Sequence, residues 1–167
     1  MPPRLQNRRM SDDATFDEGA ERPVFVTATD AEGLEVISAL TQDAVLPITE
    51  MQWEPNKRRF ALLLNRFRWE DRLAAERRGR PYERVQSLLV ADDVTHVRSQ
   101  GIDRTDRDTV LSLLALSWAP GEDGSGTLTL TLAGDGAVEL AAECLDVTLR
   151  DVTRPYLAPS GKAPTHD

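Results

Sequence analysis

The chain has 167 residues, of which 40% are hydrophobic and 29% charged, a composition typical of one globular domain with a sizeable core. No apolar run approaches the roughly 20 residues that a membrane-spanning helix needs, and the formal net charge of −8 disfavours nucleic-acid and anionic-membrane partners. The single cysteine, Cys144, excludes an internal disulfide. The composition therefore predicts a cytoplasmic, single-domain protein.

The N-terminal region is predicted to contain a tail, a short strand and one helix. Residues 1–22 mix both charges with proline and glycine, lack the apolar segment of a secretory signal, and are expected to be disordered. Residues 24–26 can form a strand. Thr29–Glu32 matches a capping box in which the Thr29 hydroxyl caps the helix. Four apolar residues then recur at helical spacing: Leu34, Ile37, Leu40 and Ala44.

From Val45 onward the hydrophobic period changes to two, which is typical of strands. Strands are expected over residues 45–53 with an irregularity at 49–50, and over 60–64, 85–90, 94–98, 110–118 and 128–132. The segment 70–81 is charged and is expected to be a loop or one helical turn. Gly134-Asp135-Gly136 is the best hairpin turn, because glycine and aspartate accept positive φ angles.

The last apolar segment, 138–152, leaves two alternatives open. Its alternation slips by one residue at Cys144–Leu145, which favours a strand with a bulge but also allows a C-terminal helix. The strand reading predicts an α+β, mostly antiparallel fold: one N-terminal amphipathic helix and a roughly seven-stranded meander, curled into a barrel or sheet. The helix reading predicts a pleckstrin-homology-like barrel. The domain is expected to span residues 23–153, followed by a Pro-rich tail over 154–167.

A gapless self-match points to an internal duplication. Residues 45–69 align with 94–118, which predicts pseudo-repeat units over about 45–91 and 94–137. The alternative is that two unrelated hairpins share alternating apolar residues. The identical pairs are Val45/Val94, Arg58/Arg107, Leu62/Leu111, Leu64/Leu113 and Trp69/Trp118.

Three segments carry a resemblance to a known family. They are Arg59–Glu70, Val97–Arg104 and Val110–Ala115. Together they resemble an uncharacterised alphaproteobacterial domain-of-unknown-function family, over about residues 24–152. This resemblance implies a bacterial setting and no assigned activity, so it supplies no site residues.

The sequence contains no recognisable catalytic, metal or cofactor set. His96 is expected on a sheet surface, His166 lies in the C-terminal tail, and Cys144 is expected to be a small core residue rather than a reactive thiol. The aspartates of 103–108 do not have calcium-loop spacing, and the glycine-rich segment 121–126 carries acids where a phosphate loop would hold phosphates. We therefore expect no enzyme, no metal and no cofactor.

The strongest candidate site is an arginine-rich region between Lys57 and Arg84. It holds 10 basic residues against 4 acidic ones, and arginine binds planar anions bidentately. The alternative is codon bias in a GC-rich genome. Within it Arg66 and Arg68 are expected on the wet face of a strand, opposite Phe67 and Trp69 in the core. The candidate ligand- or partner-binding residues are Arg58, Arg59, Arg66, Arg68, Arg77, Arg78 and Arg80.

These observations lead to two main hypotheses for function. The first is a non-enzymatic interaction module that binds a protein partner or a second copy of itself. The alternative is a binder of a phosphorylated small molecule or short nucleic acid through residues 57–84. On this reading the Trp69→Ala and Trp118→Ala substitutions should destabilise severely, whereas Arg66→Ala and Arg68→Ala should each cost less than about 1 kcal/mol.

Overall fold

The fold is one mostly antiparallel β-sheet of 11 strands, with one longer helix. It was obtained as a computed structural model, which describes residues 22–165. The strands are β1 (Phe25–Ala28), β2 (Ala44–Pro47), β3 (Met51–Glu54), β4 (Arg59–Phe67), β5 (Glu83–Ala91), β6 (Val94–Gln100), β7 (Val110–Pro120), β8 (Gly126–Leu132), β9 (Gly136–Ala142), β10 (Val147–Asp151) and β11 (Tyr156–Leu157). The α-helices are α2 (Ala31–Thr41) and α3 (Arg72–Arg78), and the 3₁₀ turns are η1 (Ile48–Glu50), η2 (Pro55–Lys57) and η3 (Trp69–Asp71).

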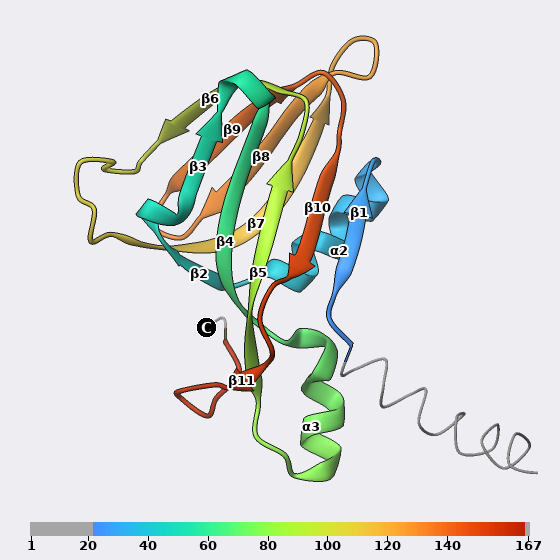
Figure 1. Cartoon of the computed structure of the whole chain (residues 1–167), viewed down its shortest axis with the longest axis vertical. Helices are drawn as coiled ribbons and strands as arrows, with labels where there is room; N and C mark the ends of the chain where they lie inside the picture. Colours follow the sequence, from blue (N-terminus) through green and yellow to red (C-terminus); the bar gives the residue numbers. More distant parts are fainter. Residues whose placement is uncertain (1–21, 166–167) are drawn as a thin grey trace, which may run out of the picture.

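The sheet folds over itself without closing. Its main path runs β1-β10-β5-β4-β2-β7-β8-β9-β6, with β3 paired to β4 and β11 paired to β5. Figure 1 shows the β7-β8-β9-β6 half behind the half that contains β3, β4 and β5. Alternating apolar residues of both halves meet between them, so that Leu62 and Leu149 share one core with Leu130 and Leu140.

The helix α2 covers one side of this core. It buries Leu34 and Ile37, and the backbone N–H of Leu116 on β7 donates to Ser38 Oγ at 3.0 Å. The helix begins one residue later than the capping box predicts. Asp30, not Thr29, is the N-cap, and its carboxylate accepts a hydrogen bond from the Gly33 N–H at 2.7 Å.

The predicted seven-stranded meander, curled into a barrel or sheet of two similar units, is wrong. The sheet has 11 strands, is not closed, and places strands that are distant in the chain side by side. The two aligned segments also pair differently, because β3 forms a hairpin with β4 whereas β6 pairs with β9 rather than β7. The duplication inferred from the self-match is therefore not reproduced in the strand pairing.

The C-terminal helix of the alternative fold is also absent from the described residues. The break at Cys144–Leu145 separates two strands, β9 and β10, instead of marking a bulge within one. β10 then pairs with both β1 and β5. The segment expected as a Pro-rich tail contributes β11, while the predicted N-terminal tail lies outside the described residues up to position 21.

Several local predictions are confirmed. The irregularity at 49–50 falls in η1, and the strand expected over 85–90 is the central part of β5. The β8–β9 hairpin turns at Gly134 and Asp135, with φ angles of 79° and 66°. Within residues 22–165, no helix is both long and apolar enough to cross a membrane.

Candidate functional site: an arginine-lined cavity

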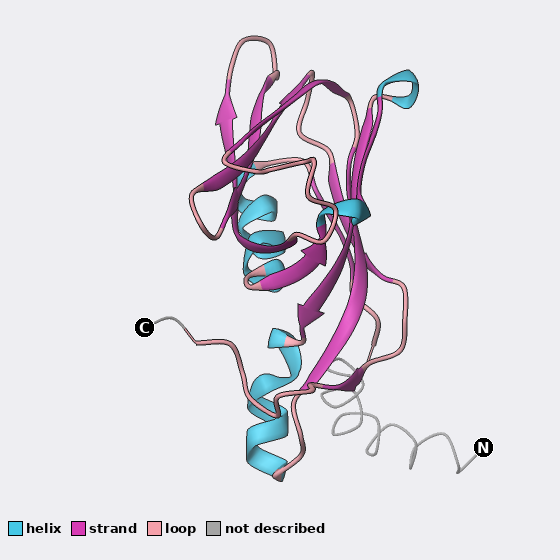
Figure 2. Cartoon of the chain, turned by 90° about the vertical axis from the view of Figure 1, so that its left-hand side faces the viewer, coloured by secondary structure: helices cyan, strands magenta, loops and turns pink. Residues whose placement is uncertain are grey.

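On three neighbouring strands of the sheet, the row of side chains that faces the core ends in a polar residue. On β4, β5 and β10 the alternation that buries Leu64, Leu89 and Leu149 continues onto Arg66, Ser87 and Asp151. The strand register puts these ends together, because Ser87 lies opposite both Leu64 and Asp151. The apolar core therefore gives way to a polar cluster at this end of the sheet. This end lies next to α3, the helix below the sheet in Figures 1 and 2.

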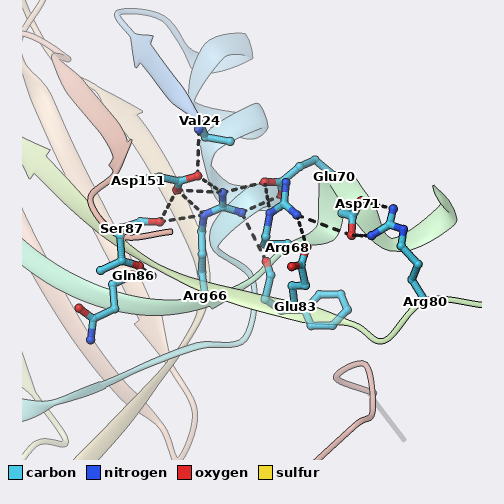
Figure 3. Close-up of polar contacts among 12 residues, drawn as sticks. Val24, Arg66, Arg68, Glu70, Asp71, Arg80, Glu83, Gln86, Ser87 and Asp151 are labelled. Atoms are coloured by element: carbon cyan, nitrogen blue, oxygen red, sulfur yellow. Dashed lines mark hydrogen bonds and ion pairs between the residues drawn. The ribbon is translucent and has the colours of Figure 1, made fainter. Parts of the chain in front are cut away.

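Arg66 is the centre of this cluster and is fully buried, with a relative exposure of 0%. Its Nη1 and Nη2 donate to the two carboxylate oxygens of Glu70, both at 2.8 Å. Its Nη2 also donates to Asp151 Oδ1 at 2.9 Å, and its Nε donates to Ser87 Oγ at 2.9 Å. Figure 3 shows the guanidinium held between these groups. The predicted wet-face position of Arg66 is therefore wrong.

The carboxylate of Asp151 accepts hydrogen bonds from three residues. Besides Arg66, it accepts from Ser87 Oγ at 2.6 Å and from the Val24 N–H at 2.9 Å. Burial disfavours the charged guanidinium, but the hydrogen bonds and charges of Glu70 and Asp151 outweigh it and raise the pKa of Arg66. The buried charges are thus paired and hydrogen-bonded, as burial requires.

A second arginine lies beside the first. Arg68 has a relative exposure of 3%, so its predicted wet-face position is also wrong. Its Nη1 donates to Glu83 Oε1 and lies 3.6 Å from Asp71 Oδ2. Asp71 is itself held by two hydrogen bonds from Arg80, at 2.9 and 3.1 Å. Figure 3 shows the resulting row of arginines and carboxylates between β4 and α3.

A cavity of about 520 Å³ opens on the solvent side of this row. Five arginines and two carboxylates line it, together with Pro23, Thr153 and Pro155. The arginines are Arg22, Arg68, Arg78, Arg80 and Arg154, and the carboxylates are Glu83 and Asp151. Arginines thus make up half of the residues that line the cavity, in a chain whose net charge is −8.

The structure brings together only part of the predicted site. Arg68, Arg78 and Arg80 line the cavity, and Arg66 lies behind it. Arg58 and Arg59 lie at the opposite end of β4, where they pair with Glu143 at 2.7 Å and Asp92 at 2.9 Å. Arg77 is exposed on α3 and is not among the cavity residues.

Sequence reasoning missed Arg22 and Arg154. They are separated by almost the whole domain, and neither lies in an arginine-rich segment. The pairing of β1 with β10, in which Phe25 lies opposite Arg150, brings the chain before β1 alongside the chain after β10. The two arginines therefore reach the cavity through tertiary structure, without any local sequence signal.

The other candidate residues are dispersed. His96 is exposed on β6, as predicted, and His166 lies outside the described residues. Among the residues that the structure describes, no three His, Cys, Asp or Glu side chains are grouped as a metal site. Cys144 was expected in the core but is exposed, with its Sγ 3.2 Å from Asp93 Oδ2, because it lies in the connection between β9 and β10.

We expect Cys144 to react slowly with alkylating agents despite its exposure. The hydrogen bond to Asp93, some desolvation of the sulfur and the surrounding carboxylates raise the pKa of the thiol, and the thiolate is the nucleophile. Reaction with iodoacetamide followed across pH should give a midpoint above that of free cysteine. Asp93→Asn should lower this midpoint, and an unchanged midpoint would contradict the assigned contact.

Comparison with known proteins identifies a family without an assigned function. A family model described as a protein of unknown function (DUF2948) matches residues 25–166. No curated protein and no solved structure matches the chain. The match confirms that the chain belongs to a domain-of-unknown-function family. It tests neither the expected alphaproteobacterial range nor any activity of the cavity.

Proposed function

We propose that this chain, which belongs to the DUF2948 family, binds a small phosphorylated molecule in the arginine-lined cavity. The observation that carries the proposal is the gathering of five arginines from separate parts of the chain around one cavity of about 520 Å³. Guanidinium groups match phosphate oxygens bidentately and keep their charge at all physiological pH values.

The buried cluster behind the cavity supports this role. Arg68 and Asp71 are nearly buried, and their ion pairs with Glu83 and Arg80 fix the side chains before a ligand arrives. Preorganised donors lose less conformational entropy on binding. The structural alternative is that the cluster only terminates the core. It accounts for Arg66 and Asp151 but not for Arg154, an exposed residue that also lines the cavity.

The size and charge of the site favour a small ligand over nucleic acid. A volume of about 520 Å³ falls within the range of small-molecule pockets, about 300–1,000 Å³. A nucleic-acid interface would instead need a basic stripe along the surface. Arg58 and Arg59, which could extend such a stripe, pair with Glu143 and Asp92 at the other end of β4.

Titration with pyrophosphate by isothermal calorimetry tests the proposal. We expect wild-type binding that weakens as salt is added, and a loss of about tenfold or more in affinity for Arg78→Ala and for Arg154→Ala, because a charge-assisted hydrogen bond contributes about 1.5–3 kcal/mol. The matched control is Arg98→Ala on β6, where a side chain 78% exposed pairs with Glu139. Absence of wild-type binding at millimolar pyrophosphate, or equal losses in all three variants, would refute it.

The interaction-module hypothesis stays a prediction, as does the bacterial, cytoplasmic setting. The large exposed apolar side chains sit on separate elements, as with Phe25 on β1, Leu73 on α3 and Val110 on β7, so they do not by themselves define a docking face. Affinity capture with the full chain as bait, including a test for self-association, would examine it.

A further inference from the structure

A second pocket lies far from the arginine-lined cavity, at the open seam of the sheet. β3 pairs only with β4, and β6 ends the main path next to β9, so the two strands face each other across a gap. Figure 2 views the molecule from this side. The gap is bounded at one end by a hydrogen bond from the Val94 N–H to the Arg58 carbonyl, and at the other by one from the Ile48 N–H to the Thr109 carbonyl, both 2.9 Å.

The pocket in this seam has a volume of about 400 Å³ and a largely apolar lining. Met51 and Trp53 of β3 form one wall, and Val97 of β6 forms the other. Phe60 and Val138, which are 4% and 1% exposed, belong to the core behind it. Such a pocket suits an apolar chain or ring, because burial of apolar surface is the main source of affinity.

Two arginines give the pocket a charged rim. Arg104 and Arg107 line it from the 101–109 loop. No side-chain ion pair with either arginine is found within residues 22–165, although the same loop holds Asp103 and Asp106. Those carboxylates instead accept hydrogen bonds from their own loop, from the Thr105 N–H at 2.9 Å and the Asp108 N–H at 3.1 Å.

The loop that carries these arginines is fixed at both ends. It begins at Gly101, which has a φ of 67° and packs so closely on the β8–β9 turn that a Cβ atom would come within 2.6 Å of the Asp135 carbonyl oxygen. Ile102 then packs against the core. The loop ends at Thr109, whose carbonyl accepts the hydrogen bond from the Ile48 N–H. Arg104 and Arg107 therefore lie beside an apolar pocket, on a loop whose two ends are anchored.

From this arrangement we propose that the seam pocket binds an amphiphilic carboxylate, with its apolar body between β3 and β6 and its carboxylate at Arg104 and Arg107. A carboxylate is the planar anion that guanidinium donors match bidentately. A monoanionic head with an apolar tail also fits the division between rim and walls. This site is independent of the phosphate-binding cavity, because it shares no residue with it.

Calorimetric titration of the full chain with decanoate and with decanol tests this inference. Wild-type protein should bind decanoate at least tenfold more tightly than decanol, because only the carboxylate engages the arginines. The double variant Arg104→Gln/Arg107→Gln should lose this preference while binding decanol as wild type does. Arg98→Gln is the matched control, because its side chain lies on β6 but is 78% exposed and does not line the pocket.

A second variant locates the apolar part of the site. Val97→Trp should fill the pocket and abolish binding of both probes, and circular dichroism checks that the variant is folded. If the variant does not fold, NMR of the wild-type protein locates the site instead, because decanoate bound in the pocket should shift the methyl signals of Val97 and Val138. No wild-type binding at millimolar decanoate, an unchanged preference in the double arginine variant, or methyl shifts elsewhere only would overturn the proposal.

Discussion

Asp151→Ala is expected to destabilise the protein by about 3–5 kcal/mol, because it leaves a buried guanidinium without its second carboxylate. Arg66 is 0% exposed, so its guanidinium depends on acceptors from neighbouring side chains rather than on bulk water. The Ser87 hydroxyl and the Val24 N–H lose their acceptor as well. Chemical denaturation followed by circular dichroism measures the effect as a lower midpoint with an unchanged slope.

Three further variants separate the effect of the buried charges on stability from the effect of side-chain packing. Arg66→Ala should also cost several kcal/mol, which replaces the sequence-based expectation of less than about 1 kcal/mol. The double variant Arg66→Met/Asp151→Leu removes both charges and should be more stable than either single variant. Arg98→Ala breaks an exposed pair and should cost at most about 1 kcal/mol. Equal stabilities of Asp151→Ala and Arg98→Ala would contradict the role of the buried cluster.

The position of Arg66 could have been predicted from β4 alone. Phe60, Leu62 and Leu64 alternate toward the core, and the same period continues onto Arg66 and Arg68. The sequence interpretation shifted the phase at Phe67, because it gave more weight to an aromatic residue than to the alternation. In the structure Arg66, Phe67 and Arg68 are all buried. Arg66 contacts Glu70 and Asp151, and the ring of Phe67 packs against Trp69 and Tyr82.

Local elements were predictable because their signals are local. The apolar stripe of α2, the Gly134–Asp135 turn and most strands follow from spacing and turn chemistry. The order of the strands depends instead on contacts between distant segments. Nothing near β6 indicates that it pairs with β9 rather than with the next strand in the chain, β7. The arginine cavity depends on the same long-range pairing, which explains why Arg22 and Arg154 were missed.

Trp69→Ala is expected to cost about 3 kcal/mol, at the lower end of the range for truncating a buried tryptophan. Its ring is half-buried and packs edge-on against Phe67, with the ring centres 4.7 Å apart. Its Nε1 donates to the Gln42 carbonyl at 3.0 Å, so it fastens η3 to the end of α2. Trp69→Phe should keep part of the ring packing and lose this hydrogen bond, which is worth about 1 kcal/mol, so its stability should lie between those of wild type and Trp69→Ala.

Trp118→Ala should cost clearly less than Trp69→Ala, although the self-match aligns the two residues. Trp118 lies near the outer end of β7, where its ring packs over the Gly126 backbone, and no side-chain hydrogen bond of its indole is found within residues 22–165. Denaturation of the three variants under the same conditions measures the difference. Equal losses of stability in Trp69→Ala and Trp118→Ala would contradict the strand pairing, which places the two residues in different surroundings. A smaller loss in Trp118→Ala would show that the two similar sequence segments occupy different places in the sheet.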